Sequence, residues 1–144
     1  MPAAVAGLAG LETVDYRESL GFPAAVQRSP EQWARLILEG ASRRERLTML
    51  SAWLALGVGL TPPSSTRQVL GWRIRHNGPD AIVLGVRAVI GLTARIVILA
   101  EGPRVTHAML VRYDRRLGAW AWRQAAPAHR RFVVGLLMRA AGTP

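Results

Sequence analysis

The sequence contains no cysteine and no lysine. The lack of cysteine excludes disulfide bonds, thiolate metal sites and thiol catalysis, and it suits a cytoplasmic protein. Charged residues are few, at 19%, whereas half of the 144 residues are hydrophobic, so the composition is not that of a disordered chain. A single domain of this length can bury roughly two-thirds of its extended surface.

Long apolar runs and targeting signals are also missing. Residues 1–11 are rich in alanine but lack the basic start of a signal peptide. Residues 47–66 carry no charge, yet only residues 47–60 are apolar, which is shorter than the roughly 20 residues that cross a bilayer. We therefore expect a cytoplasmic protein without a membrane partner.

Several sequence patterns that carry chemistry do not occur. There is neither a phosphate-binding glycine-rich loop nor a nucleophile elbow. The three histidines, His76, His107 and His129, lie far apart in the chain, without the short spacing of familiar zinc sites. We expect no metal site and no cofactor.

Positive charge is abundant, because the net charge is +10 and all nineteen basic residues are arginines. One interpretation is a protein that binds nucleic acid or an anionic membrane. The other is that the arginines are ordinary solvent-exposed residues of a protein from a genome rich in arginine codons. The arginines are scattered from Arg17 to Arg139 in runs of no more than two, which favours the second interpretation, so we expect no nucleic-acid partner.

The first part of the chain predicts a tail, a strand and two helices. Residues 1–12 are expected to be a flexible tail, and residues 13–144 a single domain. Alternating side chains over residues 13–20 predict a strand that breaks at residues 21–23 (GFP). The patterns at residues 29–32 (SPEQ) and 42–45 (SRRE) are capping boxes that start two short helices. The second helix is expected to point three leucines inward: Leu47, Leu50 and Leu54.

The second part predicts a sheet and a long helix. From residue 68 onward apolar residues recur at every second position, which indicates five strands joined by tight turns, the last over residues 119–124. We expect a long amphipathic helix to begin at Pro127 and to end at Gly142. Together these elements predict an α+β fold, a curved antiparallel sheet of about six strands with the C-terminal helix packed across it. A sheet that curls around such a helix leaves an apolar cavity.

A few short motifs accompany this order of elements. They are Asp15-Tyr16, residues 29–34 (SPEQWA), Gly71-Trp72, residues 127–130 (PAHR) and residues 136–140 (LLMRA). In this order they resemble the helix-grip fold of START-like (SRPBCC) domains, the superfamily of polyketide cyclases, and within it a family of short, uncharacterised bacterial members. The resemblance covers about residues 13–141. It implies a cavity for a hydrophobic ligand between the sheet and the C-terminal helix, and it implies no particular chemistry.

Two histidines are candidate catalytic residues. His129 is predicted in the first turn of the last helix, where the helix dipole favours a neutral imidazole that can act as a base or bind a ligand. His107 is predicted in mid-strand on the apolar face, where a polar ring needs a partner. The alternative for His129 is a structural histidine whose ring is bonded to a backbone carbonyl. For His107 it is a core histidine with a satisfied ring, or a strand register shifted by one residue, which would point the ring to solvent.

Aromatic and aliphatic side chains on the predicted inner faces are candidate ligand contacts, with ordinary core packing as the alternative. They are Trp72, Ile74, Leu84, Ile96, Met109, Trp120, Trp122, Phe132 and Leu136.

The sequence therefore predicts a protein that binds a hydrophobic or aromatic small molecule, with its activity open and a homodimer possible in principle. One alternative is an enzyme like the polyketide cyclases or an isomerase, with a cavity histidine as acid or base. Another is a non-catalytic interaction protein with arginines on its outer strands; this alternative predicts no internal cavity.

Overall fold

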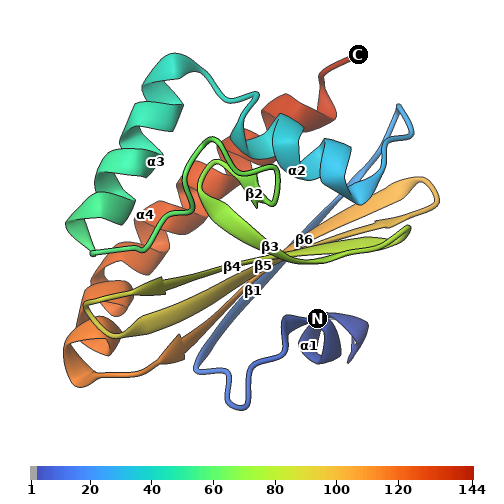
Figure 1. The fold of residues 1–144 in the computed structure, drawn as a ribbon. Coiled ribbons are helices and arrows are strands. Elements are labelled where there is room, and N and C mark those ends of the chain that lie inside the picture. The colour runs from blue at the N-terminus through green and yellow to red at the C-terminus, as the bar shows by residue number, and fades with distance from the viewer. Residues whose placement is uncertain (1–2) are drawn as a thin grey trace.

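One antiparallel sheet of six strands organises the molecule in the computed structural model, which describes residues 3–144 (Figure 1). The spatial order of the strands is β1-β6-β5-β4-β3-β2. The strands are β1 (Tyr16–Pro23), β2 (Gln68–Val69), β3 (Trp72–Asn77), β4 (Ala81–Ala88), β5 (Leu92–Glu101) and β6 (Arg104–Tyr113). The helices are α1 (Ala3–Ala9), α2 (Pro30–Leu38), α3 (Arg43–Ala55) and α4 (Arg116–Ala141).

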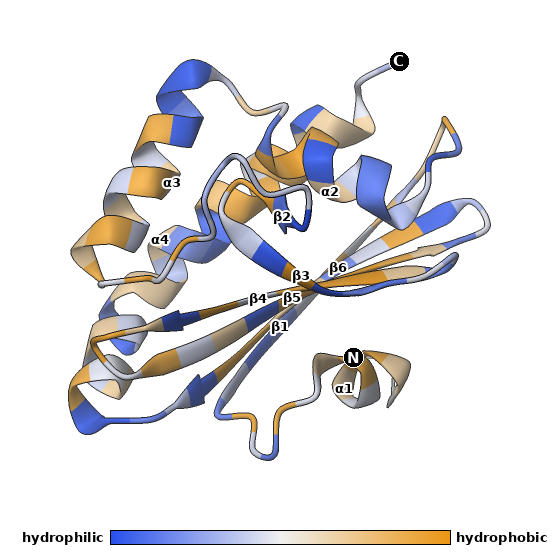
Figure 2. Cartoon of the chain, in the orientation of Figure 1, coloured by the Kyte–Doolittle hydropathy of each residue, from blue (hydrophilic) through white to orange (hydrophobic). Residues whose placement is uncertain are grey.

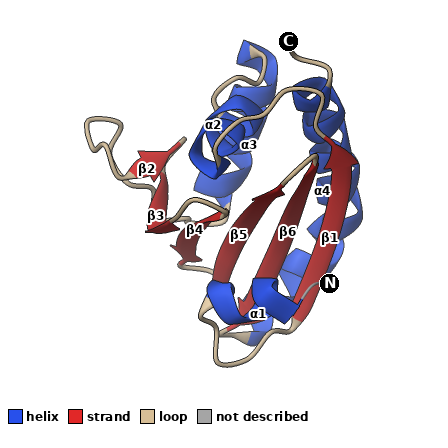
Figure 3. Cartoon of the chain, turned by 90° about the vertical axis from the view of Figure 1, so that its right-hand side faces the viewer, coloured by secondary structure: helices blue, strands red, loops and turns tan. Residues whose placement is uncertain are grey.

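The helices divide between the two faces of the sheet (Figure 3). Helices α2, α3 and α4 cover one face, here called the inner face, and α4 packs across the sheet. Helix α1 lies on the opposite, outer face. This arrangement confirms the predicted α+β fold of the helix-grip type. In residues 3–144 no helix combines the length and the apolar character that crossing a membrane requires.

Helices α2 and α3 start where the capping boxes predict. Ser29 accepts a hydrogen bond from the backbone N–H of Gln32, whose side chain accepts one in return from the N–H of Ser29. Ser42 and Glu45 repeat this exchange at the start of α3. These signals depend only on residues three positions apart, which is why the sequence alone suffices to find them.

The inward face of α3 was predicted wrongly. Leu47 and Leu54 are 57% and 66% exposed. Met49 is buried instead, and Trp53 packs edge-on against Trp72 of β3 with ring centroids 5.7 Å apart. Two apolar stripes compete on this helix, and the stripe with the larger aromatic surface faces the sheet.

The last predicted strand, residues 119–124, is wrong as well. Helix α4 begins at Arg116 and continues through Pro127, which lies inside it. The alternation of Trp120 and Trp122 indicated a strand. However, Trp122 is spaced two helical turns before His129, so it extends the apolar face of the helix predicted from Pro127 onward. Pro127 removes one backbone donor from α4, a cost that its long packed face offsets. The sixth strand is the short β2.

Strand β1 runs through the predicted break at residues 21–23. It pairs with β6 over its whole length, from Tyr16 opposite Val111 to Pro23 opposite Arg104. Because β1 is the edge of the sheet, Pro23 can lack its N–H without breaking a ladder.

The segment predicted as a flexible tail contains α1. Val5 is fully buried and Ala9 nearly so, against a patch of the outer face that includes Val83, Val97 and Leu110. In Figure 2 this helix carries no hydrophilic colour, which agrees with its alanine-rich sequence. Met1 and Pro2, also part of the predicted tail, lie outside the described residues.

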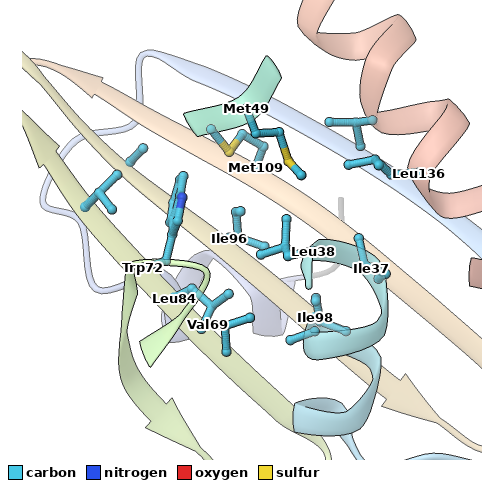
Figure 4. Close-up of a cluster of buried hydrophobic side chains, with 14 of the residues drawn as sticks. Ile37, Leu38, Met49, Val69, Trp72, Leu84, Ile96, Ile98, Met109 and Leu136 are labelled. Atoms are coloured by element: carbon cyan, nitrogen blue, oxygen red, sulfur yellow. The ribbon is translucent and has the colours of Figure 1, made fainter. Parts of the chain in front are cut away.

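The main core lies between the inner face and the helices (Figure 4). Ile96, Ile98 and Met109 from the sheet meet Ile37 of α2 and Leu136 of α4. This core holds α2 and α4 in place.

Candidate functional site: a cavity between the sheet and helix α4

A cavity of about 330 Å³ lies between the inner face of the sheet and the helices. Strands β3 to β6 form its floor, and α2, α3 and α4 form its roof. This volume is at the lower end of the roughly 300–1,000 Å³ that is usual for small-molecule sites. Its lining is almost entirely apolar, and the two histidines His107 and His129 are the ionisable side chains in it.

Six of the nine predicted ligand contacts line this cavity. They are Trp72, Ile96, Met109, Trp122, Phe132 and Leu136.

Three predicted contacts do not line it. Ile74 and Leu84 are buried in the core, where neighbouring side chains cover them. Trp120 is 60% exposed. In a strand Trp120 and Trp122 would share a face, but residues two apart on a helix point to widely different sides, so only Trp122 reaches the cavity. The placement of Trp120 in the site was therefore wrong.

Helix α3 contributes a wall that the sequence analysis missed. Met49, Ala52 and Trp53 all line the cavity. The signal was present, because Met49, Trp53 and Leu56 have helical spacing, but the leucine stripe of the same helix obscured it.

The opening of the cavity lies between α3 and α4. Thr48 and Ala52 of α3 and Ala128 of α4 belong to the lining and are also exposed to solvent. These side chains are small, so they leave an entrance that a larger residue would narrow.

His107, in the middle of β6, faces the cavity and is only 2% exposed. Burial, together with the charge of His129, lowers the pKa of His107 to about 4. The ring is therefore neutral at pH 7. Its Nδ1 atom is buried without a hydrogen-bond partner.

His129 lines the cavity from the middle of α4, not from the first turn as predicted. The helix dipole therefore does not explain a neutral ring here. Burial lowers the pKa of His129, and the negative charge of Glu18 opposes this change. Its Nδ1 is also buried without a partner, and its ring contacts that of Trp122 edge-on, 4.9 Å between centroids.

Glu18 is a buried carboxylate that the sequence analysis did not select. It is 3% exposed, and the hydroxyl of Tyr16 donates a hydrogen bond of 2.7 Å to its Oε2 atom. Its Oε1 has no partner. Burial and this hydrogen bond raise the pKa of Tyr16 to about 12. The signal was the alternation of β1, which places Glu18 on the same face as Tyr16.

Two tryptophans of the cavity lining also have an unpaired polar atom. The Nε1 atoms of Trp72 and Trp122 are buried without a partner. With the two histidines, four lining side chains thus have an unpaired nitrogen. An apolar cavity with a few convergent polar groups is the usual form of a small-molecule site.

His76 lies apart from this site, exposed near the end of β3. Within residues 3–144 no three side chains of the metal-binding types come together as a group.

Comparison with known proteins gives little more. No protein-family model matches the chain, and no curated protein matches it. Among solved structures, the chain is similar to the Mll3558 protein from Rhizobium loti, at 13% identity and a TM-score of 0.38. This likeness covers 88% of the present chain and 94% of that one, but it is too weak to assign fold or function.

Proposed function

We propose that this protein binds a hydrophobic or aromatic small molecule, as the resemblance to START-like domains implies. We further propose, from the lining residues, that this ligand carries at least one polar group. The observation that supports the proposal is an apolar cavity lined by four residues that each have a buried nitrogen without a partner: Trp72, Trp122, His107 and His129.

The two kinds of lining atom have different roles in this proposal. Apolar walls favour a ligand by about 25 cal/mol for each Å² of apolar surface removed from water. An unpaired buried polar group costs about 1–3 kcal/mol, so a ligand oxygen that accepts from Trp72 or Trp122 relieves that cost. A neutral imidazole can donate at one nitrogen and accept at the other, so His107 and His129 suit a hydroxyl or a carbonyl group.

Helix α3 is the element that admits the ligand. Met49 is its one buried residue, so few apolar contacts hold it in place. Elements of this kind open at low free-energy cost. Movement of α3 away from Ala128 would widen the entrance.

The test is binding of N-phenyl-1-naphthylamine, a neutral aromatic fluorescent probe. Ala128→Phe narrows the entrance and should weaken binding at least tenfold. Met138→Phe is the matched control, because Met138 is 71% exposed on the same helix and should keep binding within twofold of the wild type. Absence of saturable binding, or equal binding by both variants, would refute the proposal.

A second candidate is a cyclase- or isomerase-like enzyme, and the buried Glu18 close enough to act on His129 favours it. A neutral imidazole in an apolar cavity can remove a proton from a bound substrate. Ring opening of 5-nitrobenzisoxazole, in which a base takes the carbon-bound proton as the N–O bond breaks, reports such a base. His129→Gln or His107→Gln should lower this rate at least tenfold in an enzyme. In a simple binding protein the wild type and both variants should all react at the rate of solvent.

The alternative of a non-catalytic interaction protein predicts a filled interior, so the cavity counts against it. The cytoplasmic location stays a prediction.

A further inference from the structure

The outer face of the sheet gathers arginines that are scattered in the sequence. Cross-strand pairing places Arg87 opposite Thr93, and Thr93 opposite Arg112. The neighbouring row on this face places Gly85 opposite Arg95. In the sequence the arginines are scattered, which argued against an anionic partner. In the folded chain several of them lie together on one face of the sheet.

Gly85 makes room for two of these side chains. A Cβ atom at Gly85 would lie 2.5 Å from Cδ of Arg75 and 2.9 Å from Nη1 of Arg95. The side chains of Arg75 and Arg95 therefore meet above this glycine. We call Arg75, Arg87, Arg95 and Arg112 the arginine cluster.

Arg95 is the centre of the cluster and is only 8% exposed. Its Nη1 donates to the backbone oxygen of Ala94 at 3.0 Å, while its Nε is buried without a partner. Burial, and then the like charges of Arg75, Arg112 and Arg87, lower the pKa of Arg95 to about 10, so it remains charged at pH 7. A buried charge of this kind normally has a partner of opposite sign.

The cluster has little compensating negative charge. Asp114 accepts hydrogen bonds from Nε of Arg112 at 2.7 Å and from the hydroxyl of Thr93 at 2.6 Å. Among the ion pairs and hydrogen bonds of residues 3–144, no other carboxylate is joined to the cluster. Four positive charges therefore share one carboxylate, which is already engaged by Arg112.

We propose that the arginine cluster binds the phosphoryl group of a small phosphorylated compound. Planar guanidinium groups bind phosphate oxygens in pairs, with two parallel hydrogen bonds. Adjacent strands are about 4.8 Å apart, so arginines on neighbouring strands can converge on one compact anion. The nearby α1 stands on the same face, next to Leu110, and would obstruct a long polyanion laid along the strands. This site is separate from the cavity, which lies on the opposite face.

The test is isothermal titration calorimetry of the full chain with pyrophosphate. The ionic strength is held fixed, because added salt weakens the attraction between pyrophosphate and any exposed arginine. The double variant Arg75→Gln, Arg87→Gln removes two exposed members and leaves the buried Arg95 in place. The matched control, Arg44→Gln with Arg131→Gln, removes the same charge from exposed positions on α3 and α4.

We expect saturable binding of pyrophosphate, weakened at least tenfold in the cluster variant and less than twofold in the control. Pyrophosphate should also raise the melting temperature of the wild type, as any ligand of the folded state does. Equal weakening in both variants would mean nonspecific attraction and overturn the proposal. Binding of a DNA duplex without binding of pyrophosphate would overturn it too. Ala128→Phe, which tests the cavity, should leave pyrophosphate binding unchanged, so the two proposals fail separately.

Discussion

The indole of Trp122 meets the imidazole of His129 edge-on, with ring centroids 4.9 Å apart and planes at 61°. The two residues are separated by two turns of α4, on either side of Pro127. On its other side Trp122 contacts the ring of Tyr16, at 5.3 Å. Trp122 therefore joins the cavity histidine to the half-buried Tyr16 and its hydrogen-bond partner, the buried Glu18.

This position of Trp122 predicts a large difference between two neighbouring tryptophans. Trp122→Ala should lower the free energy of unfolding by about 3–5 kcal/mol, because it empties a buried site. Trp120→Ala should change it by less than about 0.5 kcal/mol, since that ring is mostly exposed. Chemical denaturation measures both. A strand over residues 119–124 would place both rings on one face, so equal losses would contradict the start of α4 at Arg116.

Two glycines of α4 should respond to alanine with opposite signs. Gly118 packs against the backbone of Gly91, and a Cβ there would collide with the backbone oxygen of that residue. Gly118→Ala should therefore cost about 1–3 kcal/mol of stability. Gly135 has no atom within 4 Å of the Cβ position, so Gly135→Ala should add about 0.5–1 kcal/mol through helix propensity. Thermal and chemical unfolding test the pair, and a destabilised Gly135→Ala would be inconsistent with an open helix surface there.

His107 should make the protein sensitive to acid. Its pKa is about 4 in the folded chain against 6.5 when unperturbed, so the unfolded state binds more protons between these values. The stability that the neutral His107 gives the folded state is fully present above pH 6.5, and it is lost as the pH falls from 6.5 toward 4. Between pH 7.5 and pH 5 the loss from this group should be about 2 kcal/mol.

Variants at two histidines isolate this effect. His107→Leu should flatten the fall in unfolding free energy between pH 7.5 and pH 5. Burial also lowers the pKa of His129, so this second cavity histidine leaves part of the acid sensitivity in place. His76→Leu is the control, because His76 is exposed and should leave the pH profile as it is. If His107→Leu has the same pH profile as the wild type, His107 is not held neutral by the fold.

A pair of alanines distinguishes open from filled space. Ala94 on β5 lines the cavity, whereas Ala108 on β6 is fully buried on the outer face under α1. Ala94→Val should stabilise the protein by about 1 kcal/mol, since its methyl groups enter free space, and should weaken binding of the aromatic probe. Ala108→Val should instead cost about 1–3 kcal/mol, because its neighbours must move. Equal destabilisation by both changes would show that the cavity is filled by side chains.

Local signals in the sequence were sufficient for much of the fold. The capping boxes at Ser29 and Ser42 and the alternation of β4, β5 and β6 involve residues two to four positions apart. Such patterns fix φ, ψ and side-chain direction without reference to the rest of the chain. The same alternation identified His107 as an inward histidine.

The predictions are wrong where two local patterns compete, or where tertiary packing continues a helix through a residue that locally favours a break. Helix α3 carries two apolar stripes, and only contact with Trp72 selects that of Met49 and Trp53. Pro127 resembles a helix start, but the long packed face of α4 carries the helix through it. A local pattern cannot weigh these contacts, because the surfaces that decide them come from distant segments.

By itself, the sequence determined the α+β class, the order of most elements and the apolar face of the sheet on which the cavity lies. Only the tertiary structure linked Glu18 to His129 through Tyr16 and Trp122, and gathered the arginines of β3 to β6 on the outer face. Local periodicity specifies which side of a strand or helix a residue occupies. Strand register and helix packing specify its neighbours, and these depend on residues far apart in the chain.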